Sequence, residues 1–197
     1  MNRYVLIIGG LTLGIGLGVA STSLSEQVQN TLTTIDTVPT RTQIDTAFDG
    51  NSQTALSNLS ALAADSSSDT GIRLRAIHAL AKYCTSMPCA ANDVAHQSVL
   101  AVVGTNSSEM VGSSVLLLRA AIETLGPMGV QTDVSVLVPL LDHGSRDIRA
   151  ATARALRDLC NTQAITPLRV RYAKEQVDQV RLAISEALRI LDQCSAN

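Results

Sequence analysis

The residues of this 197-residue sequence best suited to chemistry are four cysteines, Cys84, Cys89, Cys160 and Cys194. A zinc site is the weaker interpretation, because such sites usually combine two close cysteine pairs and only Cys84 and Cys89 are close. In an exported chain an even cysteine count favours disulfides, and three pairings are possible. Cys84 and Cys89 flank a short turn, whereas Cys160 and Cys194 end neighbouring predicted helices, which would pack about 8–10 Å apart. We therefore expect the bridges Cys84–Cys89 and Cys160–Cys194.

The three histidines, His78, His96 and His143, are isolated in the sequence. None belongs to an H-E-x-x-H motif, and the sequence contains neither a G-x-S-x-G elbow nor a phosphate-binding loop. His78 and Cys84 lie on one predicted helix but point in different directions. We expect these histidines to be hydrogen-bonded or solvent-facing, and we expect no catalytic site, no cofactor and no metal.

Residues 1–20 have the organisation of a secretory signal peptide. Arg3 precedes an uncharged apolar run over residues 4–19, and the small residues Gly18 and Ala20 stand where a signal peptidase would cut. The run is about 16 residues long, which is short for a membrane span of about 20. An uncleaved anchor is the alternative. Residues 21–40, rich in Ser, Thr and Gln, are expected to form a polar linker.

The composition favours a helical core. Hydrophobic residues make up 46% of the chain but aromatic residues only 2%, and tryptophan is absent. A core built from Ala, Leu, Val and Ile suits close helix packing better than a sheet sandwich. The net charge of −2 gives no reason to expect nucleic-acid binding.

The same helical pattern recurs along the chain. Counted from residues 72, 117, 148 and 180, apolar residues fall mostly at offsets 0, +3 or +4, +7, +8 and +11, which lie on one helical stripe. A shorter apolar helix precedes each of these four helices. We expect Asp133 to be the N-cap of the shorter helix in the third repeat. The long first interval indicates an insertion over 85–92. The pattern predicts a repeat domain over 41–194, with repeats at about 52–84, 92–128, 131–160 and 161–193, because three or more stacked hairpins are needed to bury such faces.

The repeats resemble HEAT repeats, specifically the short HEAT-like repeats first named from phycobilisome lyases. The residues that carry the resemblance are Val134, Leu137 and Pro139-Leu140-Leu141-Asp142, then Asp147-Ile148-Arg149-Ala150-Ala151 and Arg154-Ala155-Leu156. The resemblance implies an all-α fold, namely a right-handed α-solenoid of about four HEAT-like helical hairpins.

It also implies a ladder of arginines that pair with acids in the turns. The ladder arginines would be Arg73, Arg149 and Arg181, and their candidate partners are Asp69, Asp147 and Asp178. The second repeat departs from the pattern, because Leu118 stands where the arginine is expected.

Offsets +2, +6 and +9 of the longer helices lie opposite the apolar stripe and could form a binding face. They are occupied by His78, Arg119, Glu123, Arg154, Arg157, Glu186 and Arg189. This arginine-leaning row could receive an acidic peptide or protein surface, because arginine binds carboxylates through two hydrogen bonds. The alternative is a solvated face with internal ion pairs, which would contribute little to stability.

We expect a non-catalytic protein–protein interaction scaffold, exported to the periplasm or envelope of a bacterium. The expected partner is a protein or peptide of unknown identity. Two alternatives remain: a HEAT-like lyase or enzyme-accessory protein, which would need a free thiol or an acid cluster, and a membrane-tethered assembly factor. Contact with a membrane would then run only through residues 4–19.

Overall fold

The computed structural model describes residues 26, 30–33 and 39–194, and within these ranges all regular structure is helical. The prediction of an all-α protein is confirmed for this part of the chain. The predicted signal peptide or anchor (1–20) and most of the predicted linker (21–40) lie outside the described residues. None of the described helices is long and apolar enough to cross a bilayer.

After a short N-terminal helix, the described helices come in pairs, in which a first helix is followed by a second helix. The elements are α2 (Arg41–Thr46), α3 (Ser52–Ala64), α4 (Thr70–Leu80), η1 (Ala81–Tyr83), α5 (Val94–Asn106), α6 (Ser113–Met128), η2 (Gln131–Asp133), α7 (Val134–Leu137), η3 (Val138–Asp142), α8 (Arg146–Leu159), η4 (Thr162–Ala164), α9 (Ile165–Lys174) and α10 (Asp178–Cys194). The first helices are α3, α5, α7 with η3, and α9; the second helices are α4, α6, α8 and α10.

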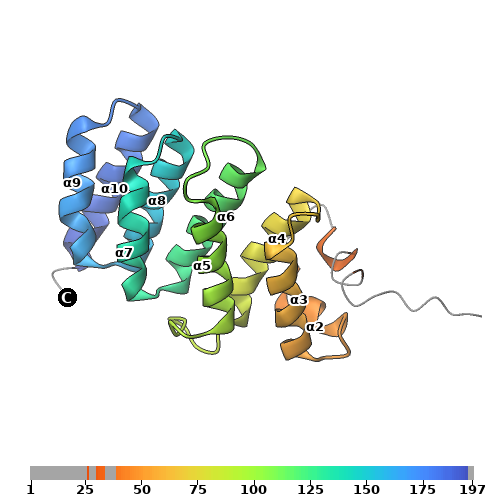
Figure 1. Cartoon of the computed structure of the whole chain (residues 1–197). Helices are drawn as coiled ribbons and strands as arrows, with labels where there is room; N and C mark the ends of the chain where they lie inside the picture. The colour runs from red at the N-terminus through yellow and green to blue at the C-terminus, as the bar shows by residue number, and fades with distance from the viewer. Residues whose placement is uncertain (1–25, 27–29, 34–38, 195–197) are drawn as a thin grey trace, which may run out of the picture.

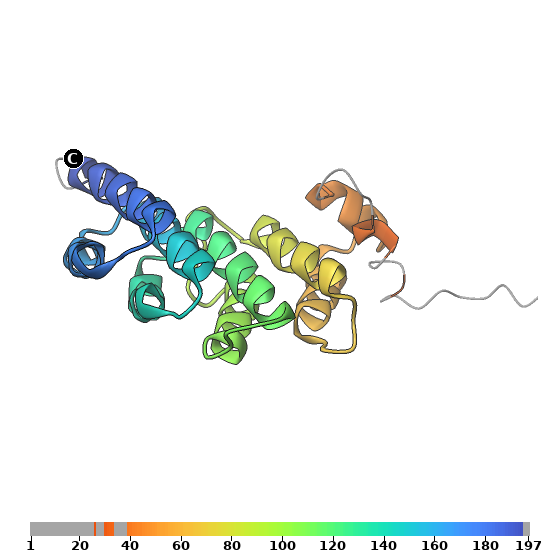
Figure 2. The same ribbon diagram turned by 90° about the horizontal axis from the view of Figure 1, so that it is seen from above.

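The pairs stack side by side and form two layers (Figure 1). Seen from above, the second helices lie in one row and the first helices lie in another (Figure 2). Each second helix contacts the next, so that α4 packs on α6, α6 on α8 and α8 on α10. Side chains that face outward from the second helices therefore lie on one continuous surface.

Small residues allow the second helices to approach one another closely. A Cβ atom built on Gly126 of α6 would lie 2.9 Å from the Cα of Ala155 on α8. Aliphatic side chains of the same two helices, such as Ile122, Leu125 and Leu156, are fully buried. Each such side chain contributes about 1.5–3 kcal/mol when it leaves water.

Two disulfides are present, with the pairings that the sequence predicted. Cys84 and Cys89, with Cα atoms 5.2 Å apart, close the loop between η1 and α5 within the predicted insertion. Cys160 and Cys194, with Cα atoms 5.8 Å apart, join the ends of α8 and α10. Cys160 is the C-cap of α8 and has a left-handed backbone, with φ 53°. The second bridge fastens the last helix, which has no described neighbour beyond it, to the rest of the stack.

Candidate functional site

The predicted binding residues lie on the second helices, and we call the surface that they form the second-helix row. It comprises His78 on α4, Arg119 and Glu123 on α6, Arg154 and Arg157 on α8, and Glu186 and Arg189 on α10. The four second helices that carry these residues follow one another along the stack (Figure 2).

A side-chain contact links His78 to the neighbouring second helix. Its Nδ1 lies 3.1 Å from the Oγ1 of Thr124, which joins α4 to α6. Burial lowers the pKa of His78 below its ordinary value, and this effect outweighs the attraction of Glu123. His78 is therefore uncharged at neutral pH and contributes shape rather than charge to the row.

Ion pairs link many of the charged residues of the row. Glu123 accepts a hydrogen bond of 2.8 Å from Arg119 Nε and also lies 3.9 Å from Arg154 Nη2. Arg157 pairs with Asp158 at 2.8 Å and with Glu186 at 3.2 Å. Arg189 has no ion-pair partner among the described residues. The row thus combines internal ion pairs with a surplus of arginine.

A shallow hollow of about 190 Å³ opens in the row between α4 and α6. Its walls are Leu74 and His78 from α4 and Leu116, Arg119, Ala120 and Glu123 from α6. Leu116 is an exposed large apolar side chain at the rim. An apolar partner side chain placed here would have arginine beside it.

The predicted ladder arginines are bound differently from the expectation. Arg149 donates to the carboxylate of Glu175, with Nε–Oε2 of 2.8 Å and Nη2–Oε1 of 3.0 Å, rather than to Asp147. Arg73 donates to the backbone carbonyl of Ala63, at 3.3 Å from Nε and 3.2 Å from Nη2. Arg181 donates to the carbonyls of Tyr172 and Glu175 and stacks on the Tyr172 ring.

The predicted acid partners must therefore be corrected. Asp69 is the N-cap of α4, where its carboxylate accepts from the backbone N–H groups of Gly71 and Ile72. Asp147 lies in the first turn of α8, with Arg146 at 4.0 Å as its ion-pair neighbour, and Asp178 lies in the first turn of α10. The arginines instead satisfy carbonyls at the C-terminal ends of the first helices, where unpaired acceptors and the negative end of the helix dipole attract cations.

Glu175 is the acid that the sequence analysis missed. It is the C-cap of α9, is 2% exposed and also accepts 2.7 Å from Arg171 Nη2 and 3.0 Å from the Val177 N–H. The hydrogen bonds from Arg149, opposed by burial and supported by Val177 and Arg171, lower the pKa of Glu175 to about 2. This carboxylate is ionised at any physiological pH and joins the last two repeats.

A second buried pair, His96 with Asp133, joins α5 to η2. Asp133 precedes α7, as predicted, but its side chain makes no capping hydrogen bond and turns inward to His96 instead. His143 accepts from the Ser145 N–H at 3.0 Å through Nδ1, and its Nε2 lies 3.1 Å from the Glu109 carbonyl oxygen. All three histidines thus have hydrogen-bond partners within the fold.

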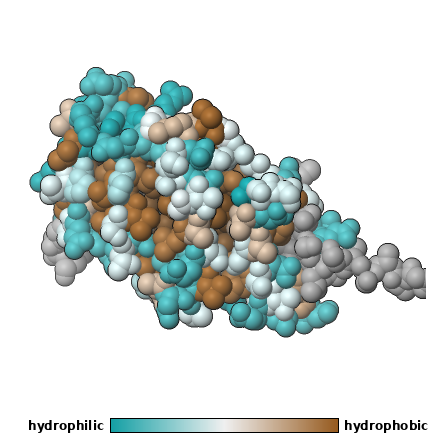
Figure 3. All heavy atoms as spheres, viewed as in Figure 1, coloured by the Kyte–Doolittle hydropathy of each residue, from teal (hydrophilic) through white to brown (hydrophobic). Residues whose placement is uncertain are grey.

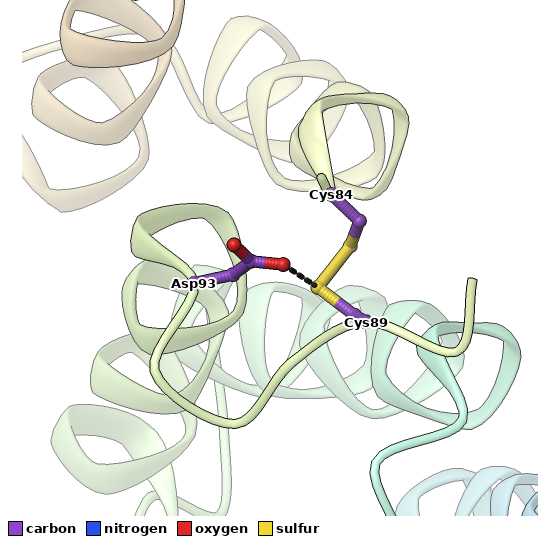
Figure 4. A group of neighbouring side chains, drawn as sticks. All are labelled: Cys84, Cys89 and Asp93. Carbon is purple, nitrogen blue, oxygen red and sulfur yellow. Dashed lines mark hydrogen bonds between the residues drawn. A yellow bond between two sulfur atoms is a disulfide. The ribbon is translucent and has the colours of Figure 1, made fainter. Parts of the chain in front are cut away.

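Asp93 lies against the first disulfide (Figure 4). The sulfur atoms of Cys84 and Cys89 and a carboxylate oxygen of Asp93 lie within 4.8 Å of one another, and Asp93 Oδ2 is 3.2 Å from Cys89 Sγ. Both sulfurs are consumed by the disulfide, so neither is a thiolate that could bind a metal. Although burial acts to raise the pKa of Asp93, hydrogen bonds from Thr85 and Ala90 lower it. The carboxylate therefore holds the loop between η1 and α5 in place through these hydrogen bonds.

Residues 105–189 match a family model described as HEAT repeats. A search among curated proteins finds no match. The matched region runs from the end of α5 to Arg189 and so includes every member of the second-helix row except His78. This part of the chain is similar to repeats that generally mediate protein–protein interaction.

Proposed function

We propose that the protein is a non-catalytic scaffold that binds an acidic segment of a partner protein along the second-helix row. In this proposal the four helix pairs form a right-handed α-solenoid of HEAT-like repeats, and the second helices line its binding side. The observation that carries the proposal is the continuity of the row over α4, α6, α8 and α10, largely within the region that matches HEAT repeats.

The charge of the row favours an acidic partner. It contains four arginines against two glutamates, and burial keeps its histidine neutral. Arg154 and Arg189 are the arginines least occupied by internal partners, because Arg154 has only a long contact of 3.9 Å to a glutamate already held by Arg119. Arginine presents its donors as a planar fork that matches a carboxylate, so these two residues are the expected anchors.

Export to a bacterial periplasm or envelope is part of the proposal. Disulfides persist in oxidising compartments and are rare in the cytosol of mesophiles. All four cysteines of the chain are joined in two bridges. The bridges leave the lyase alternative without a free thiol, so that it would need an acid cluster instead. The tethered assembly factor depends on residues 4–19, which lie outside the described part.

The test is a charge reversal at the two expected anchors. The variant Arg154→Glu with Arg189→Glu should lose most of its partner in cells that express the tagged chain, measured by in-cell crosslinking and quantitative mass spectrometry. Arg157 is left unchanged, because Asp158 and Glu186 hold it and a glutamate there would add a third carboxylate.

The matched control is Arg169→Glu. Arg169 lies on α9 in the first-helix layer, and its side chain is 65% exposed. This variant carries one such reversal on the other layer, should capture the partner as the wild type does, and is compared with each single reversal, Arg154→Glu and Arg189→Glu, as well as with the double variant. If the control and the double variant behave alike while both keep the wild-type melting temperature, the row is not the binding face.

A further inference from the structure

Arg73 has hydrogen-bond donors that the described part of the fold does not use. A guanidinium group has five N–H donors. In Arg73 the N–H of Nε and one N–H of Nη2 point to the carbonyl of Ala63. The second N–H of Nη2 and both N–H groups of Nη1 meet no hydrogen-bond acceptor in the described residues. Together, Nη1 and Nη2 form a two-donor edge that fits a carboxylate.

The equivalent arginine two repeats later binds a carboxylate through a different edge, because its Nη1 is the group that donates to backbone carbonyls. Arg149 occupies on α8 the place that Arg73 occupies on α4, and its Nε and Nη2 bind both oxygens of Glu175. Glu175 is the C-cap of α9, the first helix of the next repeat. The equivalent residue for Arg73 is the C-cap of α5, which is Ser107. Ser107 is short and uncharged, so the second repeat lacks the acid that the fourth repeat supplies.

A hollow opens beside Arg73. It encloses about 190 Å³ between α3 and α5 and is lined in part by Arg73. The remaining lining is mostly small, with Ser60, Ala63 and Ala64 from α3 and Ser98, Ala101, Val102, Thr105 and Asn106 from α5. The hollow belongs to the first-helix face, where apolar side chains gather between polar ones (Figure 3).

Asp65 at the end of α3 is an anion that interacts electrostatically with Arg73. Its oxygens accept hydrogen bonds from Ser67 and Ser68, which with a weaker contribution from Arg73 lower the pKa of Asp65 to about 2. No oxygen of Asp65 lies within ion-pair distance of Arg73 in the structure. Asp65 therefore weakens the positive field around Arg73 without occupying its donor edge.

We infer that the hollow between α3 and α5 is a binding site for a carboxylate of a partner protein, with Arg73 as the residue that binds it. The carboxylate accepts from the open edge formed by Nη1 and Nη2 of Arg73, because Nε and one N–H of Nη2 are held by Ala63. The apolar part of the ligand packs on Ala101 and Val102. The source is either an acidic side chain or a C-terminus, which share this chemistry. The site is independent of the second-helix row, because it lies between first helices.

The test uses nuclear magnetic resonance of the arginine Nε–H groups in the full chain labelled with ¹⁵N. Three tripeptide probes are titrated: acetyl-Ala-Glu-Ala amide, acetyl-Ala-Ala-Ala with a free C-terminus, and acetyl-Ala-Ala-Ala amide. The Arg73 resonance should shift saturably with at least one of the carboxylate probes and not with the uncharged amide. The responding probe identifies the source. The Arg149 resonance should stay in place, because Glu175 already occupies that guanidinium.

Three variants test whether the probes bind at Arg73. Ser107→Glu supplies the missing acid and should weaken probe binding at least about tenfold, the loss expected when one charge-assisted contact is blocked. Ser108→Glu adds the same charge at the exposed neighbouring position and should change the midpoint much less. Arg73→Lys, which keeps the charge but loses the fork, should also weaken binding. Because this variant lacks the Arg73 signal, its midpoint is read from the backbone N–H signals of Ala101 and Val102, which line the hollow. An Arg73 resonance that responds equally to the uncharged amide, or a midpoint unchanged in both Ser107→Glu and Arg73→Lys, would overturn the proposal.

Discussion

The imidazole of His96 is buried directly against the carboxylate of Asp133, with Nε2 2.9 Å from Oδ2 and only 1% and 2% of the two side chains exposed. The other ring nitrogen of His96, Nδ1, lies 3.0 Å from the carbonyl oxygen of Ala91. Both nitrogens therefore face oxygen atoms, and the contact between Nε2 and Asp133 is a buried hydrogen bond. Burial raises the pKa of Asp133, which the hydrogen bond from His96 opposes.

Two substitutions at Asp133 test whether hydrogen bonding or charge holds this pair together. Asp133→Ala should destabilise the fold by about 2–4 kcal/mol, because it leaves a buried ring nitrogen without a partner and opens a small cavity. Asp133→Asn should cost much less, because its amide can donate to Nε2 of a neutral His96 while Nδ1 donates to Ala91. Urea unfolding of both variants measures the difference. Equal losses would show that the pair is held by charge rather than by hydrogen bonding.

Features that a local sequence pattern determines could be predicted, whereas most contacts between residues far apart in the sequence could not. The helices of residues 72–83 and 180–191 were predictable, because helical periodicity is a local pattern and each apolar stripe had to be buried. The disulfide partner of Cys160 followed in turn, since stacked repeats place equivalent helix ends side by side. The partner of Arg149 did not follow, because Glu175 lies 26 positions away and only the packed turn brings it closer than Asp147.

Some of the missed contacts had a usable signal. Glu123 and Arg154 are opposite charges at the same helix position one repeat apart, so a search at the repeat spacing would have found them. Arg157 and Glu186 lie about one helical turn out of register, so only a search that also allows this shift would have found them. The pair of His96 and Asp133 had no such signal. An aspartate directly before an apolar run, as at Asp133, is equally consistent with a helix N-cap. The predicted signal peptide lies outside the described residues and stays a prediction.

Glu175→Gln should be one of the most damaging single substitutions. The variant removes the charge that faces Arg149 and Arg171 and leaves two cations together in a mostly buried site, which costs about 3 kcal/mol or more. Asp142→Asn is the matched control, because Asp142 also contacts Arg171 but is 62% exposed, so its loss should cost no more than about 1 kcal/mol. Urea unfolding of both variants tests this ranking, and a reversed order would contradict the assignment of Glu175 as the link between the repeats.

The same carboxylate predicts how stability depends on pH. The pKa of Glu175 is lowered from 4.5 to about 2 in the folded protein, so its contribution is fully present above pH 4.5 and is lost as the pH falls toward 2. The loss should be on the order of 3 kcal/mol. Asp133, whose pKa is raised, acts in the opposite direction, because its protonation favours the folded state. Unfolding free energies measured from neutrality into this acid range should fall steeply in the wild type and less steeply in Glu175→Gln.

The two disulfides should contribute unequally. The Cys160–Cys194 bridge spans 34 positions and should stabilise the fold by about 3–4 kcal/mol, whereas Cys84–Cys89 spans 5 and should contribute about 2 kcal/mol. Paired Cys→Ser variants of each bridge, compared by thermal unfolding, test this order. Intact mass after thiol alkylation supplies the control: no cysteine of the oxidised protein should react before reduction. Full alkylation of all four without reduction would remove the basis for both the disulfides and the exported location.

Two glycines on helices should respond to alanine in opposite ways. Gly126→Ala should destabilise the fold by about 1–3 kcal/mol, because the new methyl group would lie 2.9 Å from the Cα of Ala155 and backbone cannot move aside cheaply. Gly104→Ala should stabilise it by up to about 1 kcal/mol, because nothing lies within 4 Å of a Cβ there and alanine favours the helix. The propensity gain is the same at both positions, so the difference between the two unfolding free energies isolates the contact between α6 and α8. A Gly126→Ala variant as stable as Gly104→Ala would mean that the second helices are not packed as closely as the structure shows, and the continuity of the second-helix row would need to be reconsidered.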